Sequence, residues 1–283
     1  MYCIDSITRN GEVIHYIDEE SSQQNASVLL LLHGFPDNAF GWNLQITTLK
    51  DHFHVVAPFM PGTLNGNTVS SERIRTEELK KDLCQILNKV RVSQSQKVYI
   101  IAHDLGAFLA EAFAKDSEQD INGLIFLNGM GLEQFVSRKF QFTQWVKSYY
   151  AFLFQLAFVR YLVFKVLPGY FLKTAYDQSL LPLHDELRNN DNRVLSTITL
   201  YKNLFRDALK IIGKKPRQLA IPALFIWGKD DAFLNIPNLN EVDQFYIAGA
   251  VRILDGGHWV MRTRFDQVNR NILNTLNHWE KSA

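Results

Sequence analysis

Asp104 is the residue whose type and position say most about the chemistry of this chain. It follows the apolar run Val98–His103 and precedes Leu105–Ala107, a pattern that predicts a strand, a sharp turn and a helix. A nucleophile elbow has this form, with small residues two positions before and two positions after the reactive side chain. Ala102 and Gly106 meet that size requirement.

Most elbows of this kind carry a serine, and the carboxylate of Asp104 changes the expected reaction. A carboxylate that attacks an acyl carbon would form a high-energy anhydride. Displacement at a saturated carbon instead leaves an ordinary ester on the protein. Asp104 therefore predicts an electrophile with a saturated carbon and a leaving group, and it argues against a serine-type esterase.

An oxyanion site is predicted from the run His33–Pro36, which follows an early apolar run. We expect the backbone N–H of Phe35 to join the N–H of Leu105 in holding a developing oxyanion. His33 is expected to brace this loop, and His103 is expected to pack beside the elbow.

Two later segments could supply an acid and a base. Trp227–Asp231 follows another apolar run, and Gly256–Trp259 lies near the end of the sequence. In these positions His258 would activate water, while Asp231 would orient the imidazole and stabilise its charged form. Asp230 is an alternative to Asp231, because either of two adjacent aspartates can cap a turn instead.

The elements that must position these residues alternate between apolar runs and helical patterns, which predicts an α/β fold with a mostly parallel sheet flanked by helices. One helix is expected after Thr76 as its cap, and another over Phe265–Trp279. The predicted strands are Val28–Leu32, Val55–Ala57, Val98–Ala102, Gly123–Leu127 and Ala223–Trp227.

The alternation stops over residues 129–218, where helix-compatible stretches and many aromatic side chains replace it. Because the strand pattern resumes afterwards, we expect a helical cap at 129–218 inserted into one catalytic domain made of 1–128 and 219–283. An apolar pocket is predicted from the aromatic residues at the start of the cap, which are Phe135, Phe140, Phe142, Trp145, Phe152, Phe154 and Phe158.

Composition narrows the class of partner. The chain has 283 residues and a net charge of +1, which gives no reason to expect nucleic acid. Residues 149–172 are apolar but interrupted by charges, so no stable membrane span is expected. Two cysteines, Cys3 and Cys84, and an N-terminus without the features of a signal peptide favour a reducing, cytoplasmic location. A homodimer is compatible with the sequence.

Together these segments resemble the α/β-hydrolase-fold epoxide hydrolases and haloalkane dehalogenases, in the branch that uses an aspartate nucleophile. The resemblance rests on His33–Pro36, the elbow around Asp104, Trp227–Asp231 and Gly257–Trp259. The order nucleophile, acid, histidine is also that of α/β-hydrolase triads. The resemblance implies an α/β-hydrolase fold and a reaction that needs no metal or organic cofactor.

In the cap, the run Tyr201–Arg206 is similar to a helix of epoxide hydrolases whose tyrosine protonates the epoxide oxygen. That role is therefore assigned by resemblance to Tyr201. Epoxide hydrolases usually have a second cap tyrosine, for which Tyr149 and Tyr150 are the candidates nearest in order.

The resemblance implies that a small apolar epoxide is opened to a vicinal diol through an ester on Asp104, which water activated by His258 and Asp231 then hydrolyses. A haloalkane dehalogenase with the same triad is one alternative. Haloalkane dehalogenases generally place tryptophan, and fluoroacetate dehalogenases arginine, where this chain has Leu105, which has no side-chain donor. A catalytically silent binding module is the other alternative. The usual aspartate and arginine of the family are also absent at Phe59 and Pro61.

Overall fold

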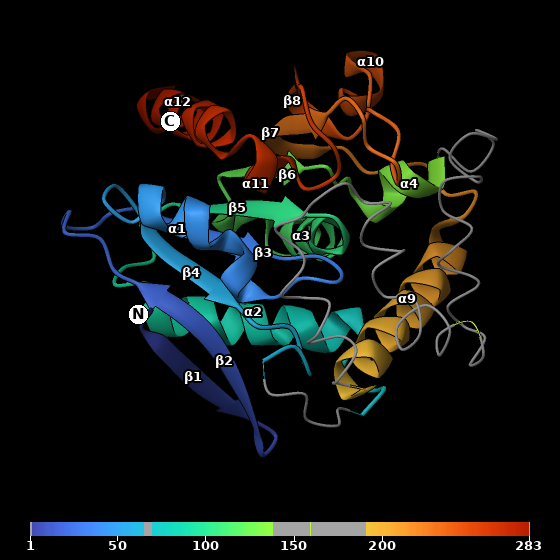
Figure 1. The fold of residues 1–283 in the computed structure, drawn as a ribbon, viewed down its shortest axis with the longest axis horizontal. Helices are drawn as coiled ribbons and strands as arrows, with labels where there is room; N and C mark the ends of the chain where they lie inside the picture. Colours follow the sequence, from blue (N-terminus) through green and yellow to red (C-terminus); the bar gives the residue numbers. More distant parts are fainter. Residues whose placement is uncertain (1, 65–69, 138–158, 160–190, 283) are drawn as a thin grey trace.

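The computed structural model describes residues 2–64, 70–137, 159 and 191–282. In these residues eight strands form one sheet, in the order β1-β2-β4-β3-β5-β6-β7-β8 (Figure 1). The strands are β1 (Ile4–Arg9), β2 (Glu12–Glu19), β3 (Val28–Leu32), β4 (His54–Pro58), β5 (Val98–His103), β6 (Gly123–Leu127), β7 (Leu219–Gly228) and β8 (Tyr246–Leu254).

The pairing of the strands brings several chain segments to one edge of the sheet. β1 and β2 are antiparallel to their neighbours, whereas β4, β3, β5, β6, β7 and β8 run parallel. The carboxyl ends of parallel strands meet at the same edge, where ligands bind in open α/β sheets. The predicted site residues follow β3, β5, β7 and β8, so they gather there.

Helices cover both faces of the sheet. On one face lie α1, α11 and α12, and on the other α2, α3 and α10. The helices are α1 (Asn43–Leu49), α2 (Thr76–Val90), α3 (Leu105–Asp116), α4 (Leu132–Ser137), α9 (Asp191–Ile211), α10 (Leu239–Val242), α11 (Val260–Thr263) and α12 (Phe265–Ser282), with short 3-10 helices η1 (Ala39–Trp42) and η2 (Glu118–Asp120).

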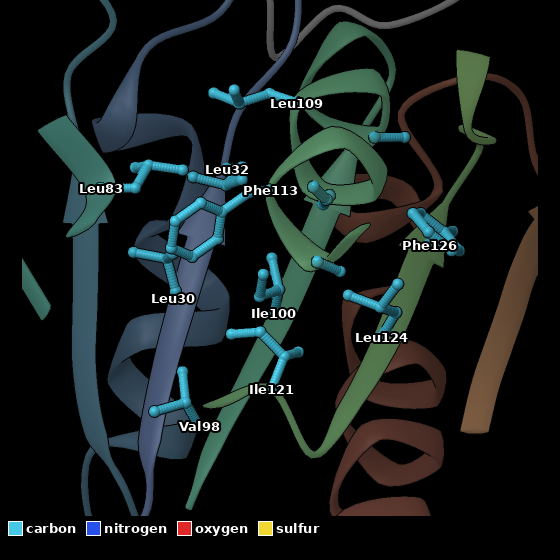
Figure 2. Close-up of a cluster of buried hydrophobic side chains, with 14 of the residues drawn as sticks. Leu30, Leu32, Leu83, Val98, Ile100, Leu109, Phe113, Ile121, Leu124 and Phe126 are labelled. Carbon is cyan, nitrogen blue, oxygen red and sulfur yellow. The ribbon is translucent and has the colours of Figure 1, made fainter. Parts of the chain in front are cut away.

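The core has two layers because side chains alternate across each strand. In β3, Leu29 and Leu31 face the layer with α12, and Leu30 and Leu32 face the layer with α2 and α3. Figure 2 shows part of the second layer, with Phe113 of α3 packed near Leu30 and Ile100 of the sheet. Parallel strands that are buried on both faces have continuous apolar sequences. The central strands can therefore be predicted from the sequence.

Each strand predicted from an apolar run is present, and β7 is longer than expected, starting at Leu219. The prediction missed β1, β2 and β8. β1 and β8 are the two edge strands, and β2 lies between β1 and β4. All three carry many exposed or half-buried residues, so they lack a continuous apolar run.

The N-cap residue predicted for α2, Thr76, is wrong by one position. The structure places Arg75 at the cap without a side-chain hydrogen bond, and Thr76 begins the helix. The Thr76 hydroxyl instead donates to Asp207 Oδ2 of α9 at 2.8 Å, and Asn203 of α9 donates to the carbonyl of Ser71 at 3.3 Å. The first residue of α2 and the segment before it thus make hydrogen bonds to α9.

Within the predicted cap, the structure describes α4 and α9, and both lie outside the sheet (Figure 1). The boundaries 129–218 remain a prediction, and the apolar stretch 149–172 lies almost wholly outside the described residues. None of the helices in the described ranges is long and apolar enough to cross a membrane. Cys3 and Cys84 are both exposed free thiols.

Candidate active site

Asp104 lies in a tight turn between β5 and α3, as the sequence predicts. Its backbone has φ 49° and ψ −122°, a conformation that costs a non-glycine residue roughly 1–3 kcal/mol. The turn has no room for larger neighbours, because a Cβ at Gly106 would lie 2.2 Å from the carbonyl oxygen of Leu32, and Ala102 is fully buried. Packing of α3 against β3 therefore holds Asp104 in a strained position at the edge of the sheet.

The Asp104 carboxylate contacts the loop after β3 with one oxygen. Oδ2 accepts a hydrogen bond from the Phe35 N–H at 2.9 Å, which is the contact predicted for one half of an oxyanion site. A Cβ at Gly34 would lie 2.6 Å from the same oxygen, so only glycine lets the loop come this close. Leu105 is the first residue of α3, where backbone N–H groups have no acceptor within the helix.

The other oxygen of Asp104 faces His258. Oδ1 lies 3.7 Å from Nε2, a distance for an ion pair rather than a hydrogen bond. Burial opposes the charged form of Asp104, but the His258 imidazolium and the Phe35 N–H hold its pKa below the usual value. Asp104 is therefore an anion at neutral pH.

His258 is oriented by Asp231, with a distance of 3.0 Å from Nδ1 to Oδ2. Since an ionised carboxylate only accepts, Nδ1 carries a proton, and Nε2 is the nitrogen turned toward Asp104. Burial alone would lower the pKa of His258, but the charges of Asp231 and Asp104 raise it to about 10. The resting site therefore holds an imidazolium between two carboxylates.

Asp231 is the acid in contact with His258, and Asp230 is not. The Asp231 side chain is buried and its Oδ1 accepts from the N–H groups of Phe233 and Leu234 at 2.7 and 3.0 Å. Burial opposes its ionisation, yet its pKa is lowered, chiefly by His258. Asp230 is exposed, and its backbone N–H donates to the carbonyl of Gly256 in the adjoining loop.

Asn128 also belongs to this network, although the sequence reasoning missed it. Its Nδ2 donates to Asp231 Oδ2 at 2.6 Å, and its Oδ1 accepts from the Gly228 N–H at 3.0 Å. It has a φ of 42° and follows β6 directly. The sequence did offer one indication of this role. Asn128 is a polar residue just before Gly129, at the carboxyl end of a predicted central strand.

Two variants separate the hydrogen bond of Asn128 from its backbone strain. We expect Asn128→Gly to lower the free energy of unfolding by roughly 1.5–3 kcal/mol, the usual value for a hydrogen bond to a charged group. Asn128→Ala should cost about 1 kcal/mol more, because alanine disfavours a positive φ. Urea unfolding measures both values. Equal stability of the wild type and Asn128→Gly would contradict the role given to the bond.

The two remaining histidines near the elbow support the loops, as the sequence predicts. His33 accepts from the Met60 N–H with Nε2, so its Nδ1 carries the proton and donates to the carbonyl of Gly34. His103 Nε2 lies 3.1 Å from the carbonyl oxygen of His258, and the two rings are 4.8 Å apart. Burial, together with the nearby charge of His258, lowers the pKa of His103 to about 4, so His103 is neutral.

Tyr201, on α9, lies at the same site as Asp104 and His258. Its ring packs edge-on against Phe35, with centroids 6.0 Å apart. The structure thus brings Tyr201 together with the predicted triad, while Tyr149 and Tyr150 lie outside the described residues. The side chains lining this candidate pocket include Phe35, Pro36, Asp104, Tyr201, Phe233, His258 and Trp259.

The chemistry of this pocket is that of an anion beside a proton donor. The lining supplies a carboxylate, an imidazolium and a phenol, together with aromatic walls. In the described ranges, no group of three or more His, Cys, Asp or Glu side chains could hold a metal ion. The arrangement can carry out nucleophilic attack by a carboxylate, followed by attack of water on the resulting ester.

The mostly parallel sheet, the elbow and the order of the site residues are typical of an α/β hydrolase. A family model for the alpha/beta hydrolase fold matches residues 27–264, and the chain belongs to that family. Within it, the chain is related to the epoxide hydrolases. It is 24% identical to mouse Epoxide hydrolase 3 over 93% of this chain and 74% of the relative, and 24% identical to human Epoxide hydrolase 4 over 96% and 77%.

Solved structures agree on the fold. An epoxide hydrolase of Bacillus megaterium in complex with an inhibitor matches with a TM-score of 0.79 and 24% identity, over 96% of this chain and all of the other. An epoxide hydrolase from metagenomes of hot environments matches with a TM-score of 0.80 and 21% identity, over 98% and 99%. At these identities the likeness establishes the α/β-hydrolase fold.

Proposed function

We propose that the protein opens an epoxide to a vicinal diol through a covalent ester on Asp104. The observation that carries this proposal is that Asp104, Tyr201 and His258 line one pocket. A nucleophile for a saturated carbon and a proton donor for the leaving oxygen are the two groups that ring opening needs. The relation to proteins named epoxide hydrolases supports the same substrate class.

In the first half-reaction, Asp104 Oδ1 attacks a ring carbon and the carbon–oxygen bond of the epoxide breaks. Oδ1 is the oxygen suited to this step, because Oδ2 is held by the Phe35 N–H. The Tyr201 hydroxyl gives its proton to the departing oxygen. The product is a hydroxyalkyl ester on Asp104, with Oδ2 as its carbonyl oxygen.

Formation of the ester then converts His258 into a base. The Asp104 carboxylate is one of the two charges that raise the pKa of His258, and the ester removes that charge. The pKa of His258 falls, and its Nε2 proton passes to the Tyr201 phenolate. Neutral Nε2 can then take a proton from water as that water attacks the ester carbonyl.

Collapse of the resulting intermediate restores the resting site. The oxyanion at Oδ2 accepts from the N–H groups of Phe35 and Leu105. The departing diol oxygen takes up the proton of the newly formed carboxyl group, which leaves Asp104 ionised opposite the His258 imidazolium. Epoxide and water are consumed, one diol forms, and Asp104, Tyr201 and His258 each return to their starting protonation state.

A substrate panel tests the reaction class. Styrene-type and fatty-acid epoxides should yield diol, while haloalkanes run beside them should release no halide. Halide release without diol would establish the dehalogenase alternative, which Leu105 disfavours because its side chain has no donor for a halide. Turnover of neither substrate class would support the silent binding module.

The proton donor is tested with Tyr201→Phe. Phenylalanine keeps the edge contact with Phe35 but has no hydroxyl, so we expect ester formation to slow by about 10²–10⁴-fold, the usual value of a positioned acid. Rapid mixing followed by mass measurement of the protein gives the rate of this step. An unchanged rate would remove Tyr201 from the reaction, and Tyr149 or Tyr150 would become the next candidates.

A further inference from the structure

Glu111 is a buried carboxylate that has no task in the reaction proposed above. It lies on α3, about two helical turns after Asp104, and is 2% exposed. Burial raises the pKa of Glu111 above its usual value, although the charge of Lys115 and the N–H of Glu133 oppose this. An apolar side chain would fill the same place without the cost of burying a carboxyl group, so packing alone does not account for a glutamate here.

The carboxylate of Glu111 contacts the part of the chain that leaves the sheet after β6. Its Oε2 accepts a hydrogen bond from the N–H of Glu133 in α4 at 3.0 Å. A Cβ at Gly131 would lie 2.1 Å from Glu111 Cδ, so the carboxyl group lies directly against the backbone of that glycine. Helix α4 as a whole also packs beside α3 (Figure 1). Glu111 thus gives residues 131–133 both a hydrogen-bond acceptor and a packing surface.

The charges around Glu111 form a small network. Lys115 follows on α3, with its Nζ 3.4 Å from Glu111 Oε1 and 2.7 Å from Glu133 Oε2. The same oxygen of Glu133 accepts a hydrogen bond from the N–H of Arg217, just before β7, at 3.1 Å. Lys115 therefore has a second acidic partner, and loss of the charge at Glu111 would leave the pair of Lys115 and Glu133 in place.

Residues 129–133, which we call the connecting segment, join Glu111 to the predicted triad. The segment begins next to Asn128, whose amide donates to Asp231 Oδ2. It then passes over the elbow, because a Cβ at Gly129 would lie 2.8 Å from the backbone nitrogen of Asp104. At its other end lies the hydrogen bond between Glu133 and Glu111. A shift of the connecting segment would therefore be felt at Asn128 and at the elbow.

The backbone of Asn128 is strained and needs support on both sides. Its φ of 42° is unfavourable for a residue with a side chain, and such a conformation persists only where the surrounding structure holds it. On the side of β6, the N–H of Asn128 donates to the carbonyl of Ile226 in β7 at 3.1 Å. On the other side, the hydrogen bond from Glu133 to Glu111 holds the connecting segment.

We propose that Glu111 is a positioning residue, whose carboxylate oxygen holds the connecting segment and so keeps Asn128 in the strained conformation that directs its amide to Asp231. Without this oxygen the segment shifts and the backbone of Asn128 relaxes. Asp231 then loses a donor and orients His258 less firmly. Ester hydrolysis uses the pair of His258 and Asp231, so the catalytic consequence falls on that half-reaction, and this consequence rests on the proposed function.

The proton on His258 Nδ1 reports this contact in the protein without substrate. A proton held between an imidazolium and a buried carboxylate gives an NMR signal far downfield and exchanges slowly with water, and His258→Gln identifies the signal by removing it. In Glu111→Leu, which keeps the bulk but has no acceptor, the exchange should become about tenfold faster or more, the equilibrium change for one hydrogen bond to a charged group. An exchange rate equal to that of the wild type would overturn the proposal.

Glu111→Gln separates the oxygen of the side chain from its charge. Glutamine keeps an oxygen that can accept from the N–H of Glu133, and Lys115 keeps its contact with the Glu133 carboxylate. The exchange of the His258 proton should therefore stay close to that of the wild type. If Glu111→Gln and Glu111→Leu speed the exchange equally, the hydrogen bond to the connecting segment is not what positions Asn128, and the proposal fails.

Gly131→Ala disturbs the same contact from the side of the segment and leaves Glu111 in place. The added Cβ meets the Glu111 carboxyl group and pushes the segment away, so the exchange should speed up as in Glu111→Leu. This variant also decides the matter if Glu111→Leu does not fold. Unchanged exchange in Gly131→Ala, in a folded protein, would contradict the role given to the contact.

Phe113→Leu is the matched control for loss of stability. Phe113 lies on the same helix as Glu111 but packs near Leu30 and Ile100 of the sheet (Figure 2). Its replacement should lower the midpoint of urea unfolding and leave the exchange of the His258 proton unchanged. Equal acceleration in Phe113→Leu and Glu111→Leu would mean that the proton reports general destabilisation, which would overturn the proposal.

Rapid mixing with an active epoxide measures the two half-reactions separately. In Glu111→Leu, hydrolysis of the ester should slow by about tenfold and its formation by less, so that the ester on Asp104 accumulates. Equal slowing of both steps would contradict a role that acts through Asp231. If the wild type forms no diol from any epoxide, the proposed function fails, whereas the exchange of the His258 proton still decides whether Glu111 positions Asn128.

Discussion

Asp104→Asn should abolish diol formation, with a fall in kcat of at least about 10⁴-fold, as for removal of a catalytic nucleophile. The amide of asparagine is a poor nucleophile and cannot form the ester. The fold should persist, because asparagine tolerates the positive φ of this position better than most residues do. The rate of diol formation measures the effect, and circular dichroism checks the fold.

The control for this variant is Asp230→Asn. Asp230 is an exposed carboxylate in the same protein with no contact to His258, so its loss should leave kcat within about twofold, as for most surface changes. Residual diol formation by Asp104→Asn at a rate near that of the wild type would show that water attacks the epoxide directly. The covalent scheme would then be wrong.

His258→Gln should trap the ester. The first half-reaction needs Asp104 and a proton donor, whereas the second needs a base for water, and glutamine cannot serve as one. We expect one epoxide molecule to become covalently bound to each protein molecule. The steady-state rate of diol formation should fall by about 10⁴-fold or more. Mass spectrometry of the intact protein detects the added mass of one epoxide, and digestion places it on the peptide containing Asp104.

Two further variants make this experiment decisive. His52→Gln removes an exposed histidine and should turn over substrate without accumulating an adduct. The double variant with Asp104→Asn and His258→Gln should form no adduct, because its nucleophile is absent. If His258→Gln binds an active substrate but gains no mass, no ester forms and the two-step scheme fails.

The sequence predicts the interior of the fold better than its borders. The central strands are buried on both faces, so each one is a continuous apolar run that can be recognised locally. β8 is different, because residues such as Ile247 and Ile253 are 63% and 56% exposed at the edge of the sheet. Its position depends on pairing with β7 along the chain from Leu219 to Gly228, which no local pattern reveals.

The site residues likewise fall into those that a local sequence pattern predicts and those whose place depends on distant contacts. Asp104 and its small neighbours follow from the steric limits of a tight turn, which act over a few residues and leave a local signature. Asn128 owes its place to Asp231, a partner 103 positions away, so nothing beside it in the sequence indicates its contact. The role predicted for Tyr201 rests on resemblance alone. The periodicity of apolar residues in α9 does not indicate that this ring points toward the elbow.

The contact between His103 and the carbonyl of His258 closes a separation of 155 positions along the chain. Phe35 and Asp104 are 69 positions apart, and Asn128 and Asp231 are 103 apart. Contacts of such range are among the slow steps of folding, because a large loop must close before any contact is gained. No N-terminal fragment ending before β8 can hold the full set of groups. Recovery of the proposed activity during refolding should therefore report completion of the whole sheet rather than of one element.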